Sequence, residues 1–200
     1  MYVKGKALNL YGKQMSNFVS MLNDQELIIQ FKQPLLKEAA FSQLLKRHQQ
    51  KVYYQIKRMV TEHADADDVA QQVWIKVWNK LDGFKMESEF STWLFRVAYN
   101  ETLNFLGKQK KQSAHNLSED NIDYENAVGN SNDPKATQIQ IALEQAIQQL
   151  PEKQRFVFML RYYEELNYEK IAAITGTTVG GAKANFHQAL KKMEEILKKD

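Results

Sequence analysis

The stretch NYEKIAAITGTTVGGAKANFHQAL (residues 167–190) contains two short helical patterns separated by a glycine. Asn167 is a favourable N-cap for the first helix, YEKIAAIT, and Gly176 supplies the left-handed residue that ends it. Thr178 is then the N-cap of a second helix that begins at Val179. Two helices joined by a tight, glycine-containing turn form a helix-turn-helix motif, which is the structure that this stretch predicts.

The second helix of this motif has two contrasting faces on a helical wheel. The apolar face consists of Val179, Ala182, Phe186, Ala189, Leu190 and Met193. The other face consists of Gly180, Lys183, Ala184, His187, Gln188 and Lys191. Small and polar residues suit insertion into the major groove of DNA, where the lysines would lie near phosphates or guanine edges.

An ordinary amphipathic helix in a three-helix bundle is the alternative for this segment. Against it, Gly180 and Gly181 each cost roughly 1 kcal/mol in helix propensity, which favours a close approach of the backbone to a ligand. The sequence GTTVGGAKA is not a phosphate-binding loop, because its lysine is displaced by one position, no hydroxyl follows it and no strand precedes it.

Apolar residues at helical spacing continue through most of the chain, which has only three prolines and eight glycines among 200 residues. The further helical patterns cover residues 25–32, 41–60, 66–81, 90–105 and 150–166, the last opened by Pro151 in its first turn. We therefore predict an all-α protein.

Residues 112–136 interrupt the helical pattern and are rich in Asn, Ser and Asp. This composition predicts a flexible, acidic linker, here placed at residues 112–138. It separates two small helical domains, residues 22–111 and 139–200. Residues 1–21 form an N-terminal arm, which would be weakly ordered or would reflect a start placed ahead of Met21.

The composition excludes several classes of function. The chain has no cysteine and its four histidines have no metal-ligand spacing, so we predict neither a disulfide nor a metal or cofactor site, and a reducing cytoplasm is the simplest compartment. No apolar run approaches the roughly 20 residues of a membrane span, so no membrane insertion is expected. Asp65, Asp67 and Asp68 are the only candidate catalytic carboxylates. Capping and helix-dipole stabilisation explain them better, so no enzyme is predicted.

Residues 90–105, FSTWLFRVAYNETLNF, are rich in aromatic and amide side chains. On a wheel a core face gathers Leu94, Phe95, Ala98, Tyr99, Phe105 and Leu106, and a second face gathers Trp93, Arg96, Asn100, Asn104 and Lys108. Amides and arginine read base edges, aromatic rings stack on bases and lysines hold phosphates. The preceding loop, DGFKMESE (residues 82–89), includes Phe84 and Lys85 and is placed to fold around an extruded base. The alternative is that Trp93 is a core tryptophan that faces another helix.

Three blocks of the sequence resemble bacterial sigma factors of the extracytoplasmic-function (ECF) group: DADDVAQQVWIKVWNKLDGF (residues 65–84), ESEFSTWLFRVAYN (87–100) and residues 150–190. The resemblance implies that the first domain is region two, which binds core RNA polymerase and opens the minus-ten element. The second domain would be region four, which reads the minus-thirty-five element and touches the polymerase β flap. Implied partners are therefore core polymerase and promoter DNA. Whether an anti-sigma factor holds the protein inactive is left open.

The resemblance also assigns roles to single residues. The contacts to the clamp helices of the β′ subunit would come from Asp68, Gln71, Gln72, Trp74 and Trp78. The minus-ten contacts would come from Phe84, Lys85, Trp93, Arg96, Asn100, Asn104 and Lys108. The minus-thirty-five contacts would come from Thr178, Gly180, Gly181, Lys183, Ala184, His187, Gln188 and Lys191.

The chain departs from the family pattern at a few of these positions. Gln72 replaces the usual glutamate. Asn185 and Gln188 replace two arginines, and Gly181 replaces a threonine, which puts the upstream promoter sequence in doubt. A wheel of residues 66–81 agrees in part with the assignment: Val69, Ala70, Val73 and Val77 face inward, and Asp68, Gln71, Gln72 and Asn79 face outward.

The implied mechanism needs no nucleotide hydrolysis. Unstacking a base pair costs a few kcal/mol, and stacking an extruded base on an aromatic ring returns roughly 1–3 kcal/mol. Contacts with polymerase would contribute the rest, and the acidic linker would occupy a basic channel of polymerase. Two other classes remain open: a stand-alone helix-turn-helix regulator that binds duplex DNA, and an enzyme acting on nucleic acid.

Overall fold

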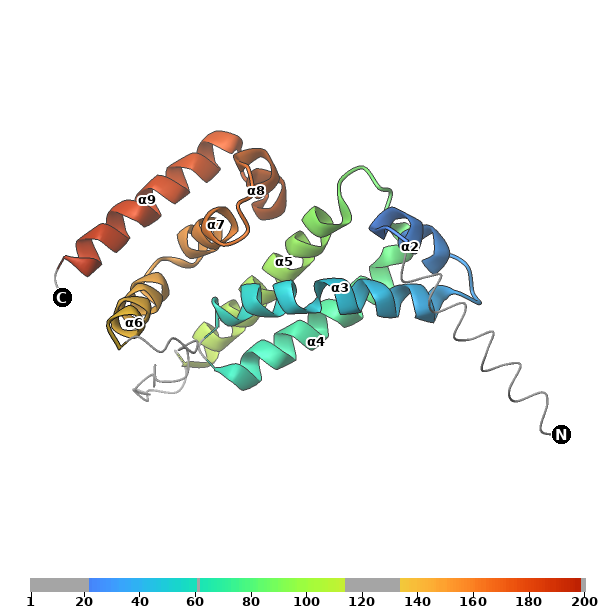
Figure 1. Cartoon of the computed structure of the whole chain (residues 1–200), viewed down its shortest axis with the longest axis horizontal. Helices are drawn as coiled ribbons and strands as arrows, with labels where there is room; N and C mark the ends of the chain where they lie inside the picture. The colour runs from blue at the N-terminus through green and yellow to red at the C-terminus, as the bar shows by residue number, and fades with distance from the viewer. Residues whose placement is uncertain (1–21, 61, 114–133, 199–200) are drawn as a thin grey trace.

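The computed structural model describes residues 22–60, 62–113 and 134–198. Within these ranges the chain is helical and contains no strand. The α-helices are α2 (Asp24–Phe31), α3 (Lys37–Lys57), α4 (His63–Lys80), α5 (Phe90–Ser113), α6 (Pro134–Gln148), α7 (Glu152–Tyr162), α8 (Tyr168–Thr175) and α9 (Val179–Leu197). A 3-10 turn, η1 (Leu81–Gly83), follows α4. The predicted all-α fold class is confirmed (Figure 1).

Helices α2 to α5 form an N-terminal unit in which α3, α4 and α5 lie side by side (Figure 1). Its core contains fully buried aliphatic residues from each of these helices, among them Leu27, Leu44, Val73 and Leu94. Helix α2 begins with a capping box. The Asn23 side chain accepts a hydrogen bond from the backbone N–H of Glu26, and the Glu26 carboxylate accepts one from the backbone N–H of Asn23.

Helices α6 to α9 form a C-terminal unit that contains the predicted helix-turn-helix. Asn167 accepts a hydrogen bond from the N–H of Lys170, and Thr178 accepts one from the N–H of Gly181. Gly176 ends α8 in the left-handed conformation, with φ 68°. The caps and the stop that the sequence predicts for this motif are therefore confirmed.

Three details of this unit differ from the sequence prediction. Leu190 was assigned to the apolar face of α9 but is 44% exposed, whereas Ala189 and Met193 of the same face are buried. Pro151 is the N-cap of α7 and not a residue of its first turn. Helix α7 also ends at Tyr162, because Glu165 adopts a φ of 52° and the chain turns toward α8.

The predicted linker is shorter at both ends than expected. Helix α5 continues to Ser113, two residues beyond the predicted boundary, and α6 already begins at Pro134. The remaining linker residues and the N-terminal arm lie outside the described residues.

The two units pack against each other, which the sequence did not predict. The rings of Tyr99 in α5 and Phe156 in α7 lie 4.3 Å apart between centroids, and both residues are buried. Helix α5 also lies against α8 (Figure 1). The described helices therefore share one continuous apolar core.

Polar contacts surround this shared core. Arg155 in α7 donates to the backbone oxygen of Met59, and Gln148 in α6 donates to that of Arg58. The guanidinium of Arg58 lies 3.8 Å from the ring centroid of Tyr163, within the range of a cation–π contact. Lys170 in α8 pairs with Glu89 in the loop before α5 at 2.7 Å. Both ends of the interface are thus fixed by side chains from each unit.

Candidate nucleic-acid and polymerase interfaces

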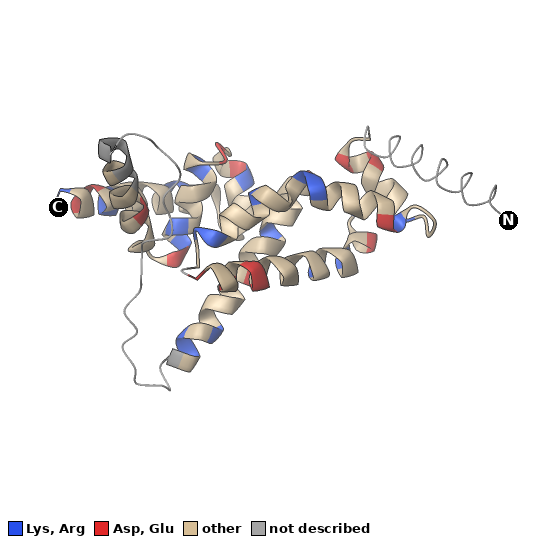
Figure 2. Ribbon diagram, turned by 60° about the horizontal axis from the view of Figure 1, so that its bottom comes forward, with Lys and Arg blue, Asp and Glu red and all other residues tan. Residues whose placement is uncertain are grey.

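The second face of α5 lies on the surface, as its wheel predicted. Arg96, Asn100, Asn104 and Lys108 are exposed, and Arg96, Asn100 and Asn104 have no hydrogen-bond partner among the described residues. Their spacing places one such group on each successive turn of the helix. The last turns of α5 are basic (Figure 2), where Lys110 and Lys111 follow. This row of amide and cationic groups can reach base edges and phosphates of a nucleic acid.

Trp93 joins this row but is partly buried. Its ring lies 5.1 Å from that of Phe84 and 5.9 Å from that of Phe90. Its ring contacts come from the preceding loop and from α5 itself, and the side chain also packs against the apolar core. Trp93 is half-buried and so remains partly accessible to solvent.

Phe84 requires a correction, because it was assigned to the DNA-contacting residues. Only 7% of Phe84 is exposed, and its ring packs beneath Trp93 and beside Phe90. A buried ring cannot stack on a base without a rearrangement of the loop. Lys85, the next residue, is exposed. Phe84 therefore supports Trp93 from below, and Lys85 is the loop residue available to a phosphate.

The outward face of α4 forms a second candidate interface. Asp68, Gln71 and Gln72 are exposed and make no side-chain hydrogen bond or ion pair among the described residues, while Val69, Val73 and Val77 are buried. Trp74 and Trp78 are partly buried against Phe41 of α3, with ring centroids 6.0 Å and 4.9 Å away. The predicted inward and outward faces of α4 are thus as the wheel placed them.

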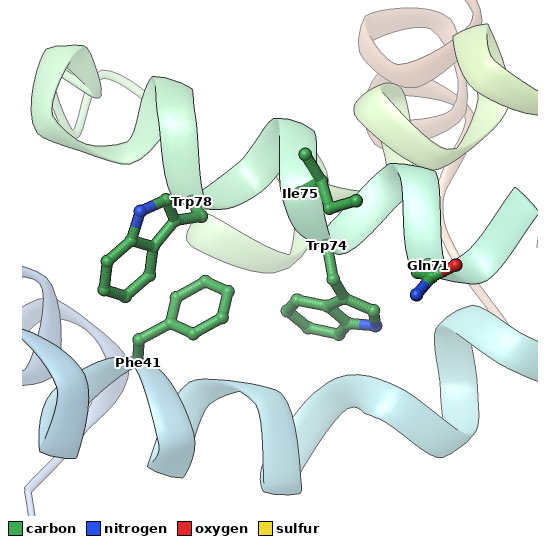
Figure 3. A pocket seen from close by; sticks show the side chains of 5 residues that line it. All are labelled: Phe41, Gln71, Trp74, Ile75 and Trp78. Carbon is green, nitrogen blue, oxygen red and sulfur yellow. The ribbon is translucent and has the colours of Figure 1, made fainter.

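An open groove lies beside this face, between α3 and α4 (Figure 3). It has a volume of about 410 Å³ and is lined by Phe41, Gln71, Trp74, Ile75 and Trp78. Ile75 is 47% exposed and was not singled out from the sequence. An outward isoleucine next to two tryptophans was the signal that would have found it. An aromatic groove with the single amide of Gln71 at its lining suits a protein partner with apolar side chains.

The outer face of α9 is the third candidate interface. Gly180, Lys183, Ala184, His187, Gln188 and Lys191 are all exposed. Three polar groups near this face are already engaged: the Thr178 hydroxyl caps α9, the Gln188 oxygen accepts from Gln154, and Asn185 donates to the backbone oxygen of Gly181. The lysines and His187 are therefore the groups most available to DNA.

The glycines at the start of α9 have different explanations. A Cβ atom at Gly181 would lie 2.6 Å from the Thr177 hydroxyl, so a local contact accounts for this glycine. A Cβ atom at Gly180 would meet nothing closer than 4.0 Å. The structure therefore does not support the prediction that Gly181 allows a close approach to a ligand.

The acidic residues at the start of α4 were the candidate catalytic carboxylates. Helix α4 is capped by Glu62 without a side-chain hydrogen bond, so the predicted capping by aspartates is wrong. Asp65 lies in the first turn, where the helix dipole favours it, and accepts a hydrogen bond from Gln109 of α5. Within the described ranges, no group of three or more acidic or histidine side chains is arranged to hold a metal. The same ranges contain no helix suited in length and hydrophobicity to crossing a bilayer.

Known proteins resemble this chain over both helical units. The family model "Sigma-70 region 2" matches residues 44–112, and "Sigma-70, region 4" matches residues 140–193. The chain is 31% identical over 165 residues to the ECF RNA polymerase sigma-E factor of Escherichia coli (strain K12), with 78% of this chain and 86% of that protein covered. It is 30% identical over 166 residues to the RNA polymerase sigma-H factor of Pseudomonas aeruginosa, covering 79% and 86%.

The fold is also similar to that of a solved sigma factor, RpoE from Bartonella quintana, whose structure was determined in complex with the anti-sigma factor NepR. The TM-score is 0.67 with 24% sequence identity, and the match covers 80% of this chain and 98% of that chain. The chain therefore belongs to the sigma-70 family, and within it to the ECF group of RNA polymerase sigma factors.

Proposed function

We propose that this sigma factor binds core RNA polymerase through α4, captures unpaired bases of the minus-ten element on α5 and reads the minus-thirty-five element with α9. The observation that carries the proposal is the row of unpartnered Arg96, Asn100 and Asn104 beside the half-buried Trp93. Binding energy alone drives strand opening, so the protein acts without being an enzyme.

The polymerase contact is best supported by the groove between α3 and α4. Its aromatic walls offer apolar area, and Asp68, exposed on the same helix one turn before Gln71, offers a charge to a cationic partner. Helical segments of a partner protein commonly occupy grooves of this kind. The clamp helices of the β′ subunit are the proposed occupant, and the β flap is the proposed contact of the C-terminal unit. The protein would then act in the cytoplasm, where polymerase and chromosome meet.

The packed arrangement of the two units bears on this role. The two promoter elements are separated by about 25 base pairs, which at about 3.4 Å per pair is roughly 85 Å. We propose that the Tyr99–Phe156 contact opens when promoter DNA is bound, so that α5 and α9 can reach elements this far apart. The relative RpoE, solved with NepR, supports an anti-sigma protein as a further partner.

Assembly with core polymerase tests the proposal. Asp68→Ala combined with Gln71→Ala is expected to weaken holoenzyme formation roughly tenfold, or about 1.4 kcal/mol, in a titration of labelled sigma factor with core enzyme. Gln49→Ala with Gln50→Ala removes two exposed amides from α3 and is the matched control. Equal affinity of both double variants and wild type would contradict the assignment of α4. A stand-alone regulator, the alternative class, would not co-purify with polymerase at all.

A further inference from the structure

A histidine that the proposed interfaces do not use lies against Phe90, the first residue of α5. His48 in α3 is buried, with 9% of its surface exposed. Its Nε2 atom lies 2.7 Å from Oδ2 of Asp24, the first residue of α2. Arg47 donates to the other oxygen of Asp24 at 2.6 Å and also to the backbone oxygen of Leu22. His48 is therefore held from one side by a carboxylate that is itself fixed.

The protonation state of Asp24 decides which partner donates in the hydrogen bond between His48 and Asp24. Burial by itself raises the pKa of the Asp24 carboxyl, but the hydrogen bonds and charges of His48 and Arg47 outweigh burial and leave the pKa below its ordinary value of 3.8. The carboxylate is thus ionised near neutral pH and can only accept hydrogen bonds. The Nε2 atom of His48 must donate, which fixes both the tautomer and the rotation of the imidazole ring.

The opposite side of the His48 ring contacts the start of α5. Its centroid lies 5.3 Å from that of Phe90, with the rings 71° apart in an edge-to-face arrangement. Phe90 is the first residue of α5 and is 3% exposed. Phe90 in turn lies 5.9 Å from Trp93, and Phe84 completes the group at 6.2 Å from Phe90 and 5.1 Å from Trp93. A continuous row of contacts therefore runs from Asp24 through His48 and Phe90 to Trp93.

We infer that His48 is a positioning residue for promoter opening, which sets the orientation of Trp93 through the Phe90 ring. The inference rests on the proposed role of α5 in capturing bases. Edge-to-face aromatic contacts are directional, and packed side chains transmit small displacements because the interior is close-packed. Asp24 fixes the imidazole, the imidazole fixes Phe90, and Phe90 with Phe84 fixes the indole at the angle that an extruded base meets.

A purely structural histidine would give a different result from a positioning one. Loss of a structural contact lowers stability and reduces all activities to the same extent. Loss of a positioning contact lowers strand opening while polymerase binding and closed-complex formation stay normal. In a protein that already lacks the Trp93 ring, loss of the positioning contact should cause no further defect, because His48 acts only through Trp93.

The experiment combines His48→Gln with Trp93→Ala in a double-mutant cycle on holoenzyme. Glutamine keeps an N–H donor for Asp24 but has no ring to contact Phe90. The readout is permanganate reactivity of unpaired thymines on a paired promoter and on a promoter with a pre-formed bubble. His48→Gln is expected to reduce reactivity about fivefold on paired DNA, to recover on the bubble and to add nothing to Trp93→Ala. Lys46→Ala, an exposed residue of α3 that contacts neither Asp24 nor the rings, is the control and is expected to open DNA normally.

A second readout needs no polymerase. In protein labelled with 5-fluorotryptophan, the resonance of Trp93 is expected to shift in His48→Gln while those of Trp74 and Trp78 stay in place. His48→Phe keeps a ring beside Phe90 and is expected to open DNA better than His48→Gln, even at equal or lower thermal stability. Better opening by His48→Phe than by His48→Gln would show that the ring beside Phe90, and not the stability of the protein, determines promoter opening.

The failures are distinguishable. If Trp93→Ala opens promoters like wild type, the role proposed for α5 is wrong and the inference falls with it. If Trp93→Ala is defective but His48→Gln is normal, or if the two defects add, the role of α5 stands and His48 is not a positioning residue. An unshifted Trp93 resonance in His48→Gln would overturn the inference in the same way.

Discussion

Tyr99 of α5 and Phe156 of α7 are in direct ring contact, with centroids 4.3 Å apart, and join the two units of the molecule. The same helix presents Arg96 and Asn100 to solvent and holds the C-terminal unit through Tyr99, which lies about 60° around the helix from Arg96. The amide and cationic row remains exposed in the packed arrangement. The contact that we propose to open on a promoter therefore lies on the side of α5 next to the residues proposed to melt it.

Removal of the Tyr99 ring should release the C-terminal unit. Tyr99→Ala deletes a buried aromatic side chain, a change that costs about 3–5 kcal/mol in well-packed cores. Because the chain has no cysteine, Ser42→Cys and Lys192→Cys can carry a dye pair on α3 and α9. Energy transfer between the dyes should fall in Tyr99→Ala while helicity is retained. Tyr162→Ala, an exposed ring within the C-terminal unit, should leave transfer unchanged; equal transfer in all three proteins would refute the role of Tyr99.

Acidification should tighten the contact between the two units. Burial raises the pKa of the carboxyl groups of Glu144 and Glu164 above the ordinary value of 4.5, although Arg58 counteracts it at both and Lys51 at Glu164. A carboxyl whose pKa is raised in the packed form binds a proton more readily there, so packing is favoured as the pH falls through the raised pKa toward 4.5. The lowered pKa of Asp24 has the opposite effect, because its ionised carboxylate stabilises the folded protein. That stabilisation is lost only as the pH falls below 3.8, outside this window.

The same dye pair measures this pH dependence. Energy transfer is expected to rise from pH 7 to pH 5 in the wild-type protein. In Glu144→Gln with Glu164→Gln the rise should be absent, because neither side chain can then take up a proton. A rise of the same size in the double variant would show that other groups are responsible.

The buried amide of Gln55 should be a source of instability. Gln55 in α3 is 3% exposed, and neither its amide nitrogen nor its oxygen has a hydrogen-bond partner among the described residues. An unpaired buried polar group costs about 1–3 kcal/mol, so Gln55→Leu should raise the free energy of unfolding by a similar amount. Urea denaturation followed by circular dichroism measures the change. Gln50→Leu on the exposed side of α3 should stay within about 0.5 kcal/mol of wild type. A destabilised Gln55→Leu would indicate a partner that the structure does not contain.

The two glycines at the start of α9 should respond differently to alanine. Gly180→Ala should stabilise the protein by up to about 1 kcal/mol, because helix propensity improves and the new methyl group meets open space. Gly181→Ala should gain less, because the Thr177 side chain must first move out of contact. Thermal unfolding compares the two. If Gly180→Ala also weakens binding to upstream promoter DNA, the missing side chain serves the nucleic acid; unchanged DNA binding would assign Gly180 no such role.

Local signals in the sequence predicted local structure well. Asn167, Gly176 and Thr178 were identifiable because a cap or a left-handed stop depends on neighbouring residues alone, and all three act as expected. The exposed row on α5 was identifiable because helical periodicity separates two faces. Leu190 was misplaced because a wheel shows a direction, whereas burial depends on how far the neighbouring helix extends.

Features that join distant segments were not predictable in this way. Tyr99 and Phe156 each look like an ordinary core residue of its own domain, so nothing in their spacing revealed their contact. Phe84 lies in a polar loop and appeared available to DNA, but the loop folds back and buries it beneath Trp93. His48 and Asp24 lie 24 positions apart, and only the packing of α2 on α3 brings them together.

The central claim is that the exposed row of α5 captures bases after the strands separate. Asn100→Ala with Asn104→Ala tests it most directly, through permanganate footprinting of unpaired thymines beside transcript yield. We expect near-normal closed complexes, a clear loss of thymine reactivity on fully paired DNA, and partial recovery on a template with a pre-made mismatch bubble, because the bubble removes most of the opening cost. Equal footprints for wild type and variant on fully paired DNA would contradict the account.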